Sequence, residues 1–387
     1  MVLIRTLLFL LLLLLLPDWY IYRRFVRRLS LRWMRTVYWI PTVLLLVGML
    51  IVGLSHDFHP SSMQRLSSYI LVFLLFAFPQ AVFTIFSLIL SPVRLIKRKC
   101  RTSEYIACAA ALYALGALIY GATEGKQHFK VREVTIAYED LPPAFDGYRI
   151  LQLSDIHSGS WTGNTKALQK AIDICNAQQA DLAVFTGDMI NNMATELDEF
   201  VPALSRLKTK DGVYSVLGNH DYSPYVHWQS EEARNANLSS LINKQNHMGW
   251  HLLINNHVML HRGQDSIVIA GVENSGNPPF PDRGDLSQAL SDECKGVFTV
   301  LLSHDPTHWR RNILPETDVQ LTLSGHTHEM QFSLFGFCPI MFVYPEHNGL
   351  YREGNQALFV NIGLGYVMFP LRIGAWPEIT VITLRKD

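Results

Sequence analysis

Four long apolar stretches fill the first third of the chain and limit what it can fold into. They are Leu3 to Tyr22, Val37 to Leu54, Ser68 to Leu90 and Tyr105 to Ala122. Each approaches the roughly 20 residues that a helix needs to cross the hydrocarbon core of a bilayer, where a helix also satisfies its own backbone polar groups. The last three hold no charged residue, so a buried helix of a soluble protein is a poor alternative. We expect a membrane anchor of about four transmembrane helices in residues 1–123.

The first stretch has a second interpretation, as a secretory signal peptide. Arg5 precedes the apolar run Leu10 to Leu16, as in such peptides. However, Pro17 to Tyr20 offers no small-residue cleavage site, and Arg23 and Arg24 follow at once. We expect a retained helix, with cleavage as the alternative.

The loops between the stretches differ in charge, which predicts their orientation. Two loops are basic, with Arg23, Arg24, Arg27, Arg28, Arg32 and Arg35 in the first and Arg94, Lys97, Arg98, Lys99 and Arg101 in the third. The loop between them, Ser55 to Ser67, holds only Arg65. Because Lys and Arg collect on the cytoplasmic side, both basic loops are expected inside. Everything after Thr123 is then expected on the periplasmic or extracellular face of the cytoplasmic (inner) membrane, whether or not the first helix is cleaved.

The formal net charge of zero conceals two unlike halves. Residues 1–123 carry 13 Lys and Arg against 3 Asp and Glu, whereas residues 124–387 carry 20 against 30. The second part is therefore acidic, which disfavours binding of a polyanion such as a nucleic acid. A nuclease is a weak alternative, and we expect no nucleic-acid partner.

The apolar stretches lack the residues that usually mark a transport pathway through a membrane. Transport pathways are usually marked by ionisable residues inside the spans, and Glu104 lies only at an edge of the last one. We therefore favour an anchor over a transporter or a non-catalytic receptor. A lipid-borne substrate near the bilayer becomes an alternative for the domain that is anchored.

After Thr123 short apolar strands alternate with helical intervals. The expected strands are Tyr148 to Ser154, Asp181 to Thr186, Val213 to Leu217, Ile267 to Val272, Val297 to Ser303, Val319 to Ser324 and Ile379 to Leu384. The expected helices are Asn164 to Gln178, Thr195 to Leu207 and Ser230 to His247. This pattern is typical of α/β layering, and residues 124–387 suffice for one large domain.

Metal-ligating residue types fall where these strands end. Asp155 and His157 follow the first strand, Asp188 the second, Asn219 and His220 the third, His304 a later one, and His326 and His328 the next. Ligands in open α/β sheets gather outside the carboxyl ends of strands, so we expect the residues to meet at one sheet edge. Gly187, Gly218 and Gly325 precede ligands and permit close backbone approach.

Carboxylate, imidazole and amide oxygen together suit borderline-hard divalent ions such as Mn, Fe or Zn, among which the sequence does not choose. Two such ions, less the charges of Asp155, Asp188 and a bridging hydroxide, leave about one positive charge to receive a phosphate oxygen. A two-metal centre of this kind lowers the pKa of water and stabilises charge at phosphorus. The predicted reaction is hydrolysis of a phosphomonoester or phosphodiester by attack of the metal-bridging hydroxide.

With these motifs, residues 145–385 resemble the calcineurin-like metallophosphoesterases, and in particular their membrane-anchored or exported bacterial branch, the YkuE/YaeI-like phosphodiesterases. The resemblance implies an α/β fold, a four-layer α/β/β/α sandwich. It implies that Asp155, His157 and His328 bind one metal ion and Asn219, His304 and His326 the other, with Asp188 bridging both.

The resemblance also places His220 at the substrate, where an imidazole can protonate the leaving alkoxide. Asp221 is expected to orient the His220 ring and raise its pKa, so both are predicted catalytic residues. A histidine that merely caps the strand is the alternative.

Three positions depart from the family pattern or stay open. Many relatives continue the last motif with two glycines, whereas this chain has Glu329 and Met330. Glu329 is expected either to shape the substrate site or to face solvent. Asn191 stands where purple acid phosphatases carry a tyrosine ligand, so no iron–tyrosinate centre is expected. Arg372 is either a phosphate contact or part of a structural turn.

The sequence therefore predicts a membrane-anchored phosphoric ester hydrolase, with residues 1–123 as anchor and residues 124–387 as catalytic domain. The main alternative is a hydrolase of pyrophosphate or phosphodiester lipid headgroups.

Overall fold

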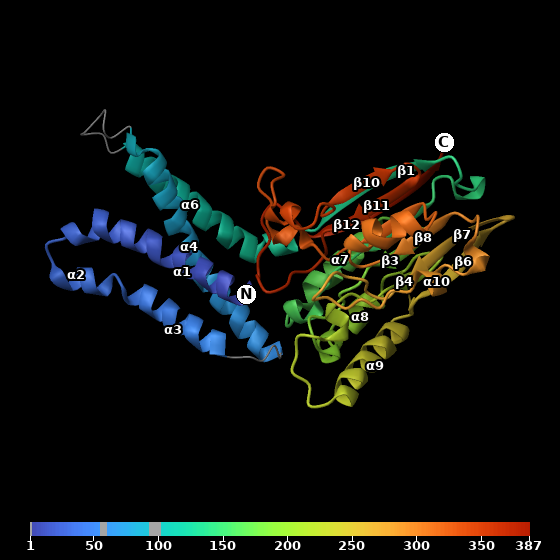
Figure 1. Ribbon diagram of the computed structural model, residues 1–387, viewed down its shortest axis with the longest axis horizontal. Coiled ribbons are helices and arrows are strands. Elements are labelled where there is room, and N and C mark those ends of the chain that lie inside the picture. Colours follow the sequence, from blue (N-terminus) through green and yellow to red (C-terminus); the bar gives the residue numbers. More distant parts are fainter. Residues whose placement is uncertain (1, 55–59, 93–101) are drawn as a thin grey trace. The chain divides into compact units, whose positions relative to one another are not determined.

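The computed structural model describes residues 2–54, 60–92 and 102–387 (Figure 1). The chain forms two compact units, and the main division between them lies between Glu124 and Gly125. The first unit is helical, and the second is built on two β-sheets.

Helices occupy the four predicted apolar stretches. They are α1 (Val2–Arg24), α2 (Arg32–Val37), α3 (Ile40–Leu54), α4 (Pro60–Ile89) and α6 (Thr102–Thr123). By length and composition, three helical segments of the described chain are able to span a membrane: Arg32–Gly53, Ser62–Ile89 and Thr102–Gln127. The first stretch is helical as expected but is not among them. The basic residues Arg94 to Arg101 lie outside the described residues.

One carboxylate is buried among the N-terminal helices. Asp18 of α1 is inaccessible, and its side chain accepts hydrogen bonds from the hydroxyls of Tyr38 and Thr42. Arg24 and Glu104 form an ion pair between α1 and α6, with Nη2 and Oε1 2.6 Å apart. Hydrogen bonds offset the cost of burying the Asp18 carboxylate, so these contacts are compatible with a helical anchor.

The first sheet has the strand order β1-β12-β2-β3-β4-β5. Its strands are β1 (Lys130–Tyr138), β12 (Glu378–Lys386), β2 (Arg149–Leu153), β3 (Leu182–Phe185), β4 (Val213–Ser215) and β5 (Trp250–Leu252). The four strands from β2 to β5 are parallel, and β12 runs antiparallel to β2. Parallel strands buried on both faces read as continuous apolar runs, which is why their positions were predictable.

The second sheet has the order β10-β11-β9-β8-β7-β6. Its strands are β10 (Gly349–Glu353), β11 (Gln356–Val360), β9 (Leu321–Ser324), β8 (Thr299–Leu302), β7 (Asp265–Gly271) and β6 (Asn256–Arg262). The inner four are parallel, and the edge strands β6 and β10 are antiparallel to their neighbours. The strands β1, β5, β6, β10 and β11 were not predicted.

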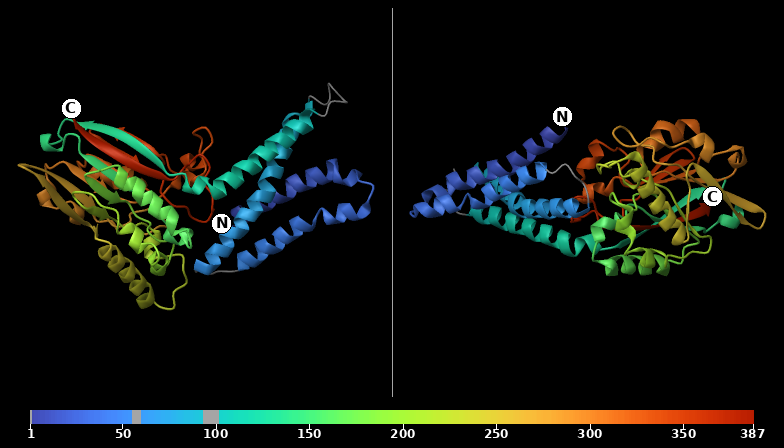
Figure 2. Two further views of the ribbon diagram at one scale, coloured as in Figure 1. Left: turned by 180° about the vertical axis from the view of Figure 1, so that it is seen from behind. Right: turned by 90° about the horizontal axis from the view of Figure 1, so that it is seen from below.

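Three apolar cores separate the layers of this unit. Successive residues of β2 face opposite sides: Ile150 enters the core between the two sheets, and Leu151 enters the core under the helices. A third core, which includes Trp309, covers the outer face of the second sheet. The resulting order is helix, sheet, sheet, helix, so the predicted four-layer α/β architecture is confirmed. The layers can be followed from two further sides in Figure 2.

The helices of this unit agree with the sequence in two places and differ in one. α7 (Thr165–Ala177) and α9 (Glu231–His247) occupy predicted intervals. The predicted helix Thr195 to Leu207 is instead a 3₁₀ turn, η5 (Ala194–Leu197), followed by the short helix α8 (Val201–Leu204). Pro202 lies in the first turn of α8, and proline starts a helix but cannot continue one. Two shorter helices, α10 (Leu286–Ala289) and α11 (Leu314–Glu316), complete the unit.

The predicted ligands do not lie at the edge of one sheet. Asp155, Asp188 and Asn219 follow strands of the first sheet, whereas His304 and His326 follow strands of the second. The two sheets pack face to face through a shared core, so their carboxyl edges meet. That expectation is corrected to a site formed by two adjoining edges.

Candidate metal centre

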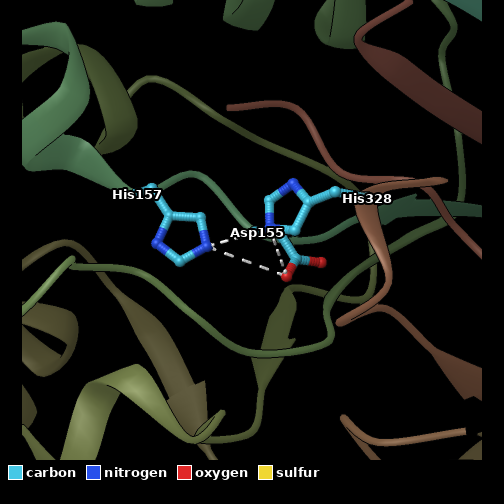
Figure 3. Close-up of side chains that lie close together, drawn as sticks. All are labelled: Asp155, His157 and His328. Carbon is cyan, nitrogen blue, oxygen red and sulfur yellow. Dashed lines mark hydrogen bonds and ion pairs between the residues drawn. The ribbon is translucent and has the colours of Figure 1, made fainter. Parts of the chain in front are cut away.

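The first donor cluster joins the loop after β2 to the loop after β9. Nε2 of His157 lies 3.0 Å from Nε2 of His328 and 4.0 Å from Oδ1 of Asp155. Nε2 of His328 lies 3.2 Å from the same carboxylate oxygen. Figure 3 shows the two rings and the carboxylate pointing toward one another. All three side chains are buried.

Two of these separations, 3.0 and 3.2 Å, fit neighbouring ligands of one divalent ion, and the third, 4.0 Å, is longer. Ligand atoms at 2.0–2.2 Å from a metal stand about 3.0 to 3.5 Å apart in octahedral or tetrahedral geometry. Two imidazole nitrogens and a carboxylate oxygen that face one another in a dry site form such a donor set.

The second donor cluster is centred on His304. Its Nε2 lies 3.2 Å from Oδ2 of Asp188 and 3.2 Å from Oδ1 of Asn219. Nδ1 of His326 lies 3.3 Å from the same nitrogen. The amide oxygen of Asn219 is thus as far from the His304 nitrogen as two ligands of one ion are from each other. Together with two imidazoles and a carboxylate it forms a second set that fits a divalent ion.

Asp188 belongs to both clusters through a single oxygen. Its Oδ2 lies 3.2 Å from Nε2 of His304 and 3.6 Å from Nε2 of His157. Its Oδ1 accepts a hydrogen bond from the backbone N–H of His220 at 2.8 Å, which fixes the carboxylate. Asp188 therefore lies in both donor clusters, and the bridging of two ions, which the family resemblance implies, stays a prediction.

Two glycines allow the loops to meet. A Cβ atom at Gly218 would overlap the Asp188 carboxylate, and one at Gly325 would overlap the side chains of Ser154 and Asp155. The predicted need for close backbone approach at these positions is therefore met.

Most ligands sit on left-handed backbone, which side chains rarely adopt. The φ angles are 52° for Asp155, 48° for His157, 61° for Asp188, 74° for His326 and 50° for His328. After His328 the left-handed run continues through Glu329 (φ 48°), Met330 (φ 48°) and Gln331 (φ 58°). Such backbone clusters at functional sites, where the surrounding structure holds it in place.

Outer contacts fix the rings of three candidate ligands. Nδ1 of His304 donates to the carbonyl oxygen of Thr186 at 2.7 Å, which leaves Nε2 free to bind a metal ion. Nε2 of His326 lies 2.9 Å from the hydroxyl of Tyr344 and 3.8 Å from Oδ2 of Asp305. Asp305 is fully buried, and this oxygen has no hydrogen-bond partner among the described residues.

Arg372 lies under the first cluster and is fully buried. Its guanidinium donates to the carbonyl oxygens of Gly365, Ala375 and Ile362, at 2.7, 2.9 and 2.9 Å. Nη2 also donates to Nδ1 of His328 at 3.1 Å, so the hydrogen of a neutral ring is on Nε2, toward Asp155. A neutral ring that held an ion through Nε2 would carry its hydrogen on Nδ1 instead, so this contact with Arg372 belongs to the tautomer without an ion. Of the two expectations for Arg372, the structure supports the structural one.

Charges in the site shift two ionisation equilibria strongly. Burial alone would lower the pKa of His304, but the Asp188 carboxylate outweighs it and raises that pKa to about 10. Burial, assisted by the charge of Asp188, raises the pKa of Asp221 to about 7. Both shifts reflect the anionic oxygens that lie close together in this buried site.

The structure gives His220 and Asp221 different partners from those expected. Nδ1 of His220 donates to the carbonyl oxygen of Asn191 at 2.7 Å, and burial lowers the pKa of His220. The Asp221 carboxylate instead accepts four backbone N–H bonds of 2.9–3.3 Å, from Gly218, Asp188, Met189 and Ile190. Asp221 therefore ties two ligand-bearing loops together, and Asn191 orients the His220 ring.

His220 also reaches the donor clusters. Its ring centre lies 4.8 Å from that of His157, and together with His157 and Asp188 it forms a third group able to hold an ion. The ring is only half-buried, so it borders the accessible side of the site.

Glu329 neither faces solvent nor lines the metal clusters. It is buried, and its carboxylate accepts a hydrogen bond from Nδ2 of Asn348 at 2.9 Å. Its carbonyl oxygen lies 3.0 Å from Sγ of Cys338. The departure from glycine is thus accommodated by contacts away from the ligands.

The sequence analysis did not assign four residues to the site: Asp305, Asn191, Tyr225 and Tyr344. The one available hint was that Asp305 directly follows the candidate ligand His304. Asn191 was noted for another reason, and Tyr225 and Tyr344 lie in loops without a motif.

Two family models match this chain. One, described as the transmembrane domain of a probable calcineurin-like phosphoesterase, matches residues 4–126. The other, described as a calcineurin-like phosphoesterase, matches residues 148–330. Together they cover the helical unit and the loops that carry all seven candidate ligands.

Two curated relatives share substantial sequence identity with this chain. The metallophosphoesterase YkuE of Bacillus subtilis is 35% identical over 290 residues, which cover 72% of this chain and 93% of that protein. A transmembrane protein with a metallophosphoesterase domain from Danio rerio is 32% identical over 276 residues, 69% of this chain. That alignment spans 60% of the zebrafish protein, less than two thirds of its length.

A solved structure described as a dimetal phosphatase from Danio rerio is a more distant match. It shows 14% identity and a TM-score of 0.34, over 56% of this chain and 88% of that one. The family models and the identity to YkuE carry the assignment. The chain belongs to the calcineurin-like phosphoesterase family, as a membrane-associated metallophosphoesterase with a buried His/Asp metal-binding site.

Proposed function

We propose that this protein is a two-metal hydrolase of a phosphomonoester or phosphodiester, with residues 1–123 as its membrane anchor and residues 124–387 as its catalytic domain. The observation that carries this is the shared oxygen of Asp188, 3.2 Å from His304 and 3.6 Å from His157. One carboxylate oxygen between two complete donor sets suits a pair of ions better than a single one.

The residues divide into two sets with one member in common. Asp155, His157 and His328 would hold one ion, and Asn219, His304 and His326 the other, with Asp188 in both sets. When bound, two divalent ions activate water and stabilise charge on the phosphoryl oxygens. Asn219 ligates without adding negative charge, so the centre keeps a positive charge for an anionic substrate. Mn, Fe and Zn all suit these donors.

His220 would supply the proton for the leaving group. Because Nδ1 donates to the Asn191 carbonyl, Nε2 is the nitrogen that can carry and release a second proton. A general acid placed in this way typically contributes about 10²- to 10⁴-fold to the rate. Asp221 acts indirectly, by holding the loops of Asp188 and Asn219 in register.

Metal content and turnover test the proposal directly. The full chain is purified in detergent, stripped with a chelator and reloaded with Mn²⁺, Fe²⁺ or Zn²⁺. Bound metal is counted, and p-nitrophenyl phosphate is compared with bis-p-nitrophenyl phosphate. We expect two ions per chain and turnover of at least one ester. Two bound ions without hydrolysis of either would contradict an esterase, and a single ion would contradict the bridge.

We also propose that the catalytic domain faces the periplasm or the extracellular space. The basic loops that flank the spans support this through the positive-inside rule. A reporter that is active only outside the cytoplasm, fused to the C-terminus, is expected to be active. Activity of a cytoplasm-specific reporter at the same position would reverse the orientation.

A lipid-borne substrate is the second candidate, and one surface feature favours it. The segment 332–345 has no charged residue, and within it Phe335 is 101% exposed and Phe342 77% exposed. Tyr344 belongs to the same segment, and its hydroxyl contacts Nε2 of His326. Exposed apolar patches on soluble domains often mark membrane or lipid contacts.

The two candidates separate in a vesicle assay. The chain reconstituted in phosphatidylglycerol vesicles is given a phospholipid and a soluble phosphodiester in parallel. Phe335→Ser with Phe342→Ser should lower turnover of the lipid alone if lipids are substrates. Equal effects on both esters, or none, would leave the soluble ester as the favoured substrate.

A further inference from the structure

Two tyrosines from distant parts of the chain meet at the second donor cluster. The hydroxyl of Tyr225 lies 2.8 Å from Nδ2 of Asn219, and the hydroxyl of Tyr344 lies 2.9 Å from Nε2 of His326. Each phenol therefore touches a candidate ligand, but on the atom that faces away from the ion. Both side chains are half-buried, so they border the open side of the site.

Chemistry fixes the direction of both hydrogen bonds. The Asn219 side chain presents its oxygen to the cluster, so the atom near Tyr225 is the amide nitrogen, which can only donate. His326 presents Nδ1 to the cluster, 3.3 Å from Nε2 of His304. A neutral ring that ligates through Nδ1 carries its hydrogen on Nε2, which donates to Tyr344. Both phenol oxygens are therefore acceptors.

Each phenol consequently keeps its own O–H group. Within the described part of the chain, neither hydroxyl has an acceptor for this hydrogen. A phenol keeps its hydrogen at neutral pH, because its ordinary pKa is about 10. Other tyrosine hydroxyls of the same unit donate their hydrogen to an acceptor: Tyr138 donates to the Gln320 carbonyl, Tyr148 to Asp211 and Tyr222 to Glu273.

The free hydrogens lie where a substrate would bind. The ring centre of Tyr225 is 4.6 Å from that of His220, the proposed proton donor, and that of Tyr344 is 5.4 Å from that of His326. The cationic side chain in contact with the clusters is Arg372, and four of its five N–H groups face three carbonyl oxygens and His328. A phosphoryl group has only acceptors, and Arg372 is fully buried beneath the first cluster, away from the open side of the site.

We propose that Tyr225 and Tyr344 donate hydrogen bonds to the non-bridging oxygens of the substrate phosphoryl group, on the side of the second ion. The inference rests on the proposed function, because it requires a phosphoryl group at the two-metal site. The pair binds the substrate with neutral donors where many phosphate sites use Arg or Lys. It also connects the ligands to the substrate, since each phenol accepts from a ligand and donates to the ester.

A purely structural role makes a different prediction. If the phenols only hold Asn219 and His326 in place, removing a hydroxyl weakens metal binding and leaves phosphate affinity unchanged once metal is restored. If they bind the substrate, phosphate affinity falls while metal content stays the same.

The experiment compares Tyr225→Phe, Tyr344→Phe and the double variant with Tyr138→Phe as a matched control. Tyr138 also loses one hydroxyl bond, to a backbone carbonyl remote from the clusters. Each full-length protein is loaded with Mn²⁺, its metal is counted, and binding of inorganic phosphate is measured by calorimetry. Turnover of the preferred nitrophenyl ester is measured on the same samples.

We expect each single variant to bind phosphate about 10-fold more weakly and the double variant about 100-fold, since each loses one hydrogen bond to a charged group. Metal content should stay at two ions per chain, and KM should rise. Tyr138→Phe should match the wild type in phosphate affinity.

Unchanged phosphate affinity in the double variant, or a loss explained wholly by lost metal, would overturn the inference alone. A wild-type protein that takes up two ions but neither binds phosphate nor hydrolyses an ester would overturn the proposed function with it.

Discussion

The two donor clusters share Asp188 but differ in their surroundings. The first is closed: Asp155 and His157 are inaccessible, and the fully buried Arg372 lies against His328. The second is bordered by half-buried Tyr225 and Tyr344 and by a buried Asp305 oxygen that has no hydrogen-bond partner among the described residues. The first cluster is thus enclosed by the folded core, while the second has an open border, where we propose that the substrate binds. The contrast suggests that damage to the first will appear as lost stability, and damage to the second as lost binding.

The largest effect is expected where the two clusters join. Asp188→Ala removes the one oxygen common to both, so both ions should bind more weakly. The loss of activity should exceed the ~100-fold typical of losing an outer hydrogen bond to a ligand. Metal counting and ester turnover on the purified full chain check this. A variant that keeps two ions would show that the clusters are independent.

A smaller effect is expected at His220, which lies between the clusters. His220→Ala should lower kcat by about 10²- to 10⁴-fold, because the leaving group then departs without a proton donor. Metal content should remain at the wild-type level. The deficit should also shrink for esters whose leaving groups need no proton. Loss of an ion from this variant would instead make His220 a ligand.

Next comes a test of the closed half. Arg372→Met leaves the carbonyls of Gly365, Ala375 and Ile362 without their buried donor, and each unsatisfied group costs about 1 to 3 kcal/mol. We expect at least about 3 kcal/mol lower stability in chemical denaturation of the chelator-treated protein. Arg206→Met, which breaks an exposed ion pair with Asp173, should cost about 1 kcal/mol or less. Equal costs for the two variants would remove the distinction.

The smallest effect is expected in the open half. Asp305→Asn keeps the shape of the side chain but removes the charge that stands 3.8 Å from Nε2 of His326. His326 becomes a weaker base, so one of the two ions should bind about 10-fold more weakly. Titration with a fluorescent chelator measures this, and the unfolding transition should stay in place. A stability loss comparable to that of Arg372→Met would contradict the comparison.

The ligands were predictable because their chemistry restricts residue type and their strands are apolar on both faces. Asp188 and His304 stand one or two residues after buried runs, and only a few side chains bind divalent ions. The division of the strands between two sheets was accessible only through the family resemblance, because an apolar run does not reveal its neighbours in a sheet.

The residues behind the ligands escaped prediction for a different reason. Tyr225 and Tyr344 reach the site along loops whose paths depend on the packing of the whole domain. Asp221 was assigned to the ring beside it in sequence, yet four backbone N–H groups from two loops surround its carboxylate. Hydrogen-bond partners of this kind are set by tertiary structure and leave no periodic trace.

The left-handed run after the last ligand has a consequence for how this chain tolerates mutation. A side chain held in that conformation costs roughly 1 to 2 kcal/mol, which glycine avoids. Glu329 recovers part of that cost through the hydrogen bond from Asn348, whereas the Met330 side chain is 47% exposed. A substitution of Met330 by glycine can therefore raise the stability of the domain without changing a ligand. The stability gained at this position, next to the candidate metal centre, could offset destabilising substitutions elsewhere in the domain.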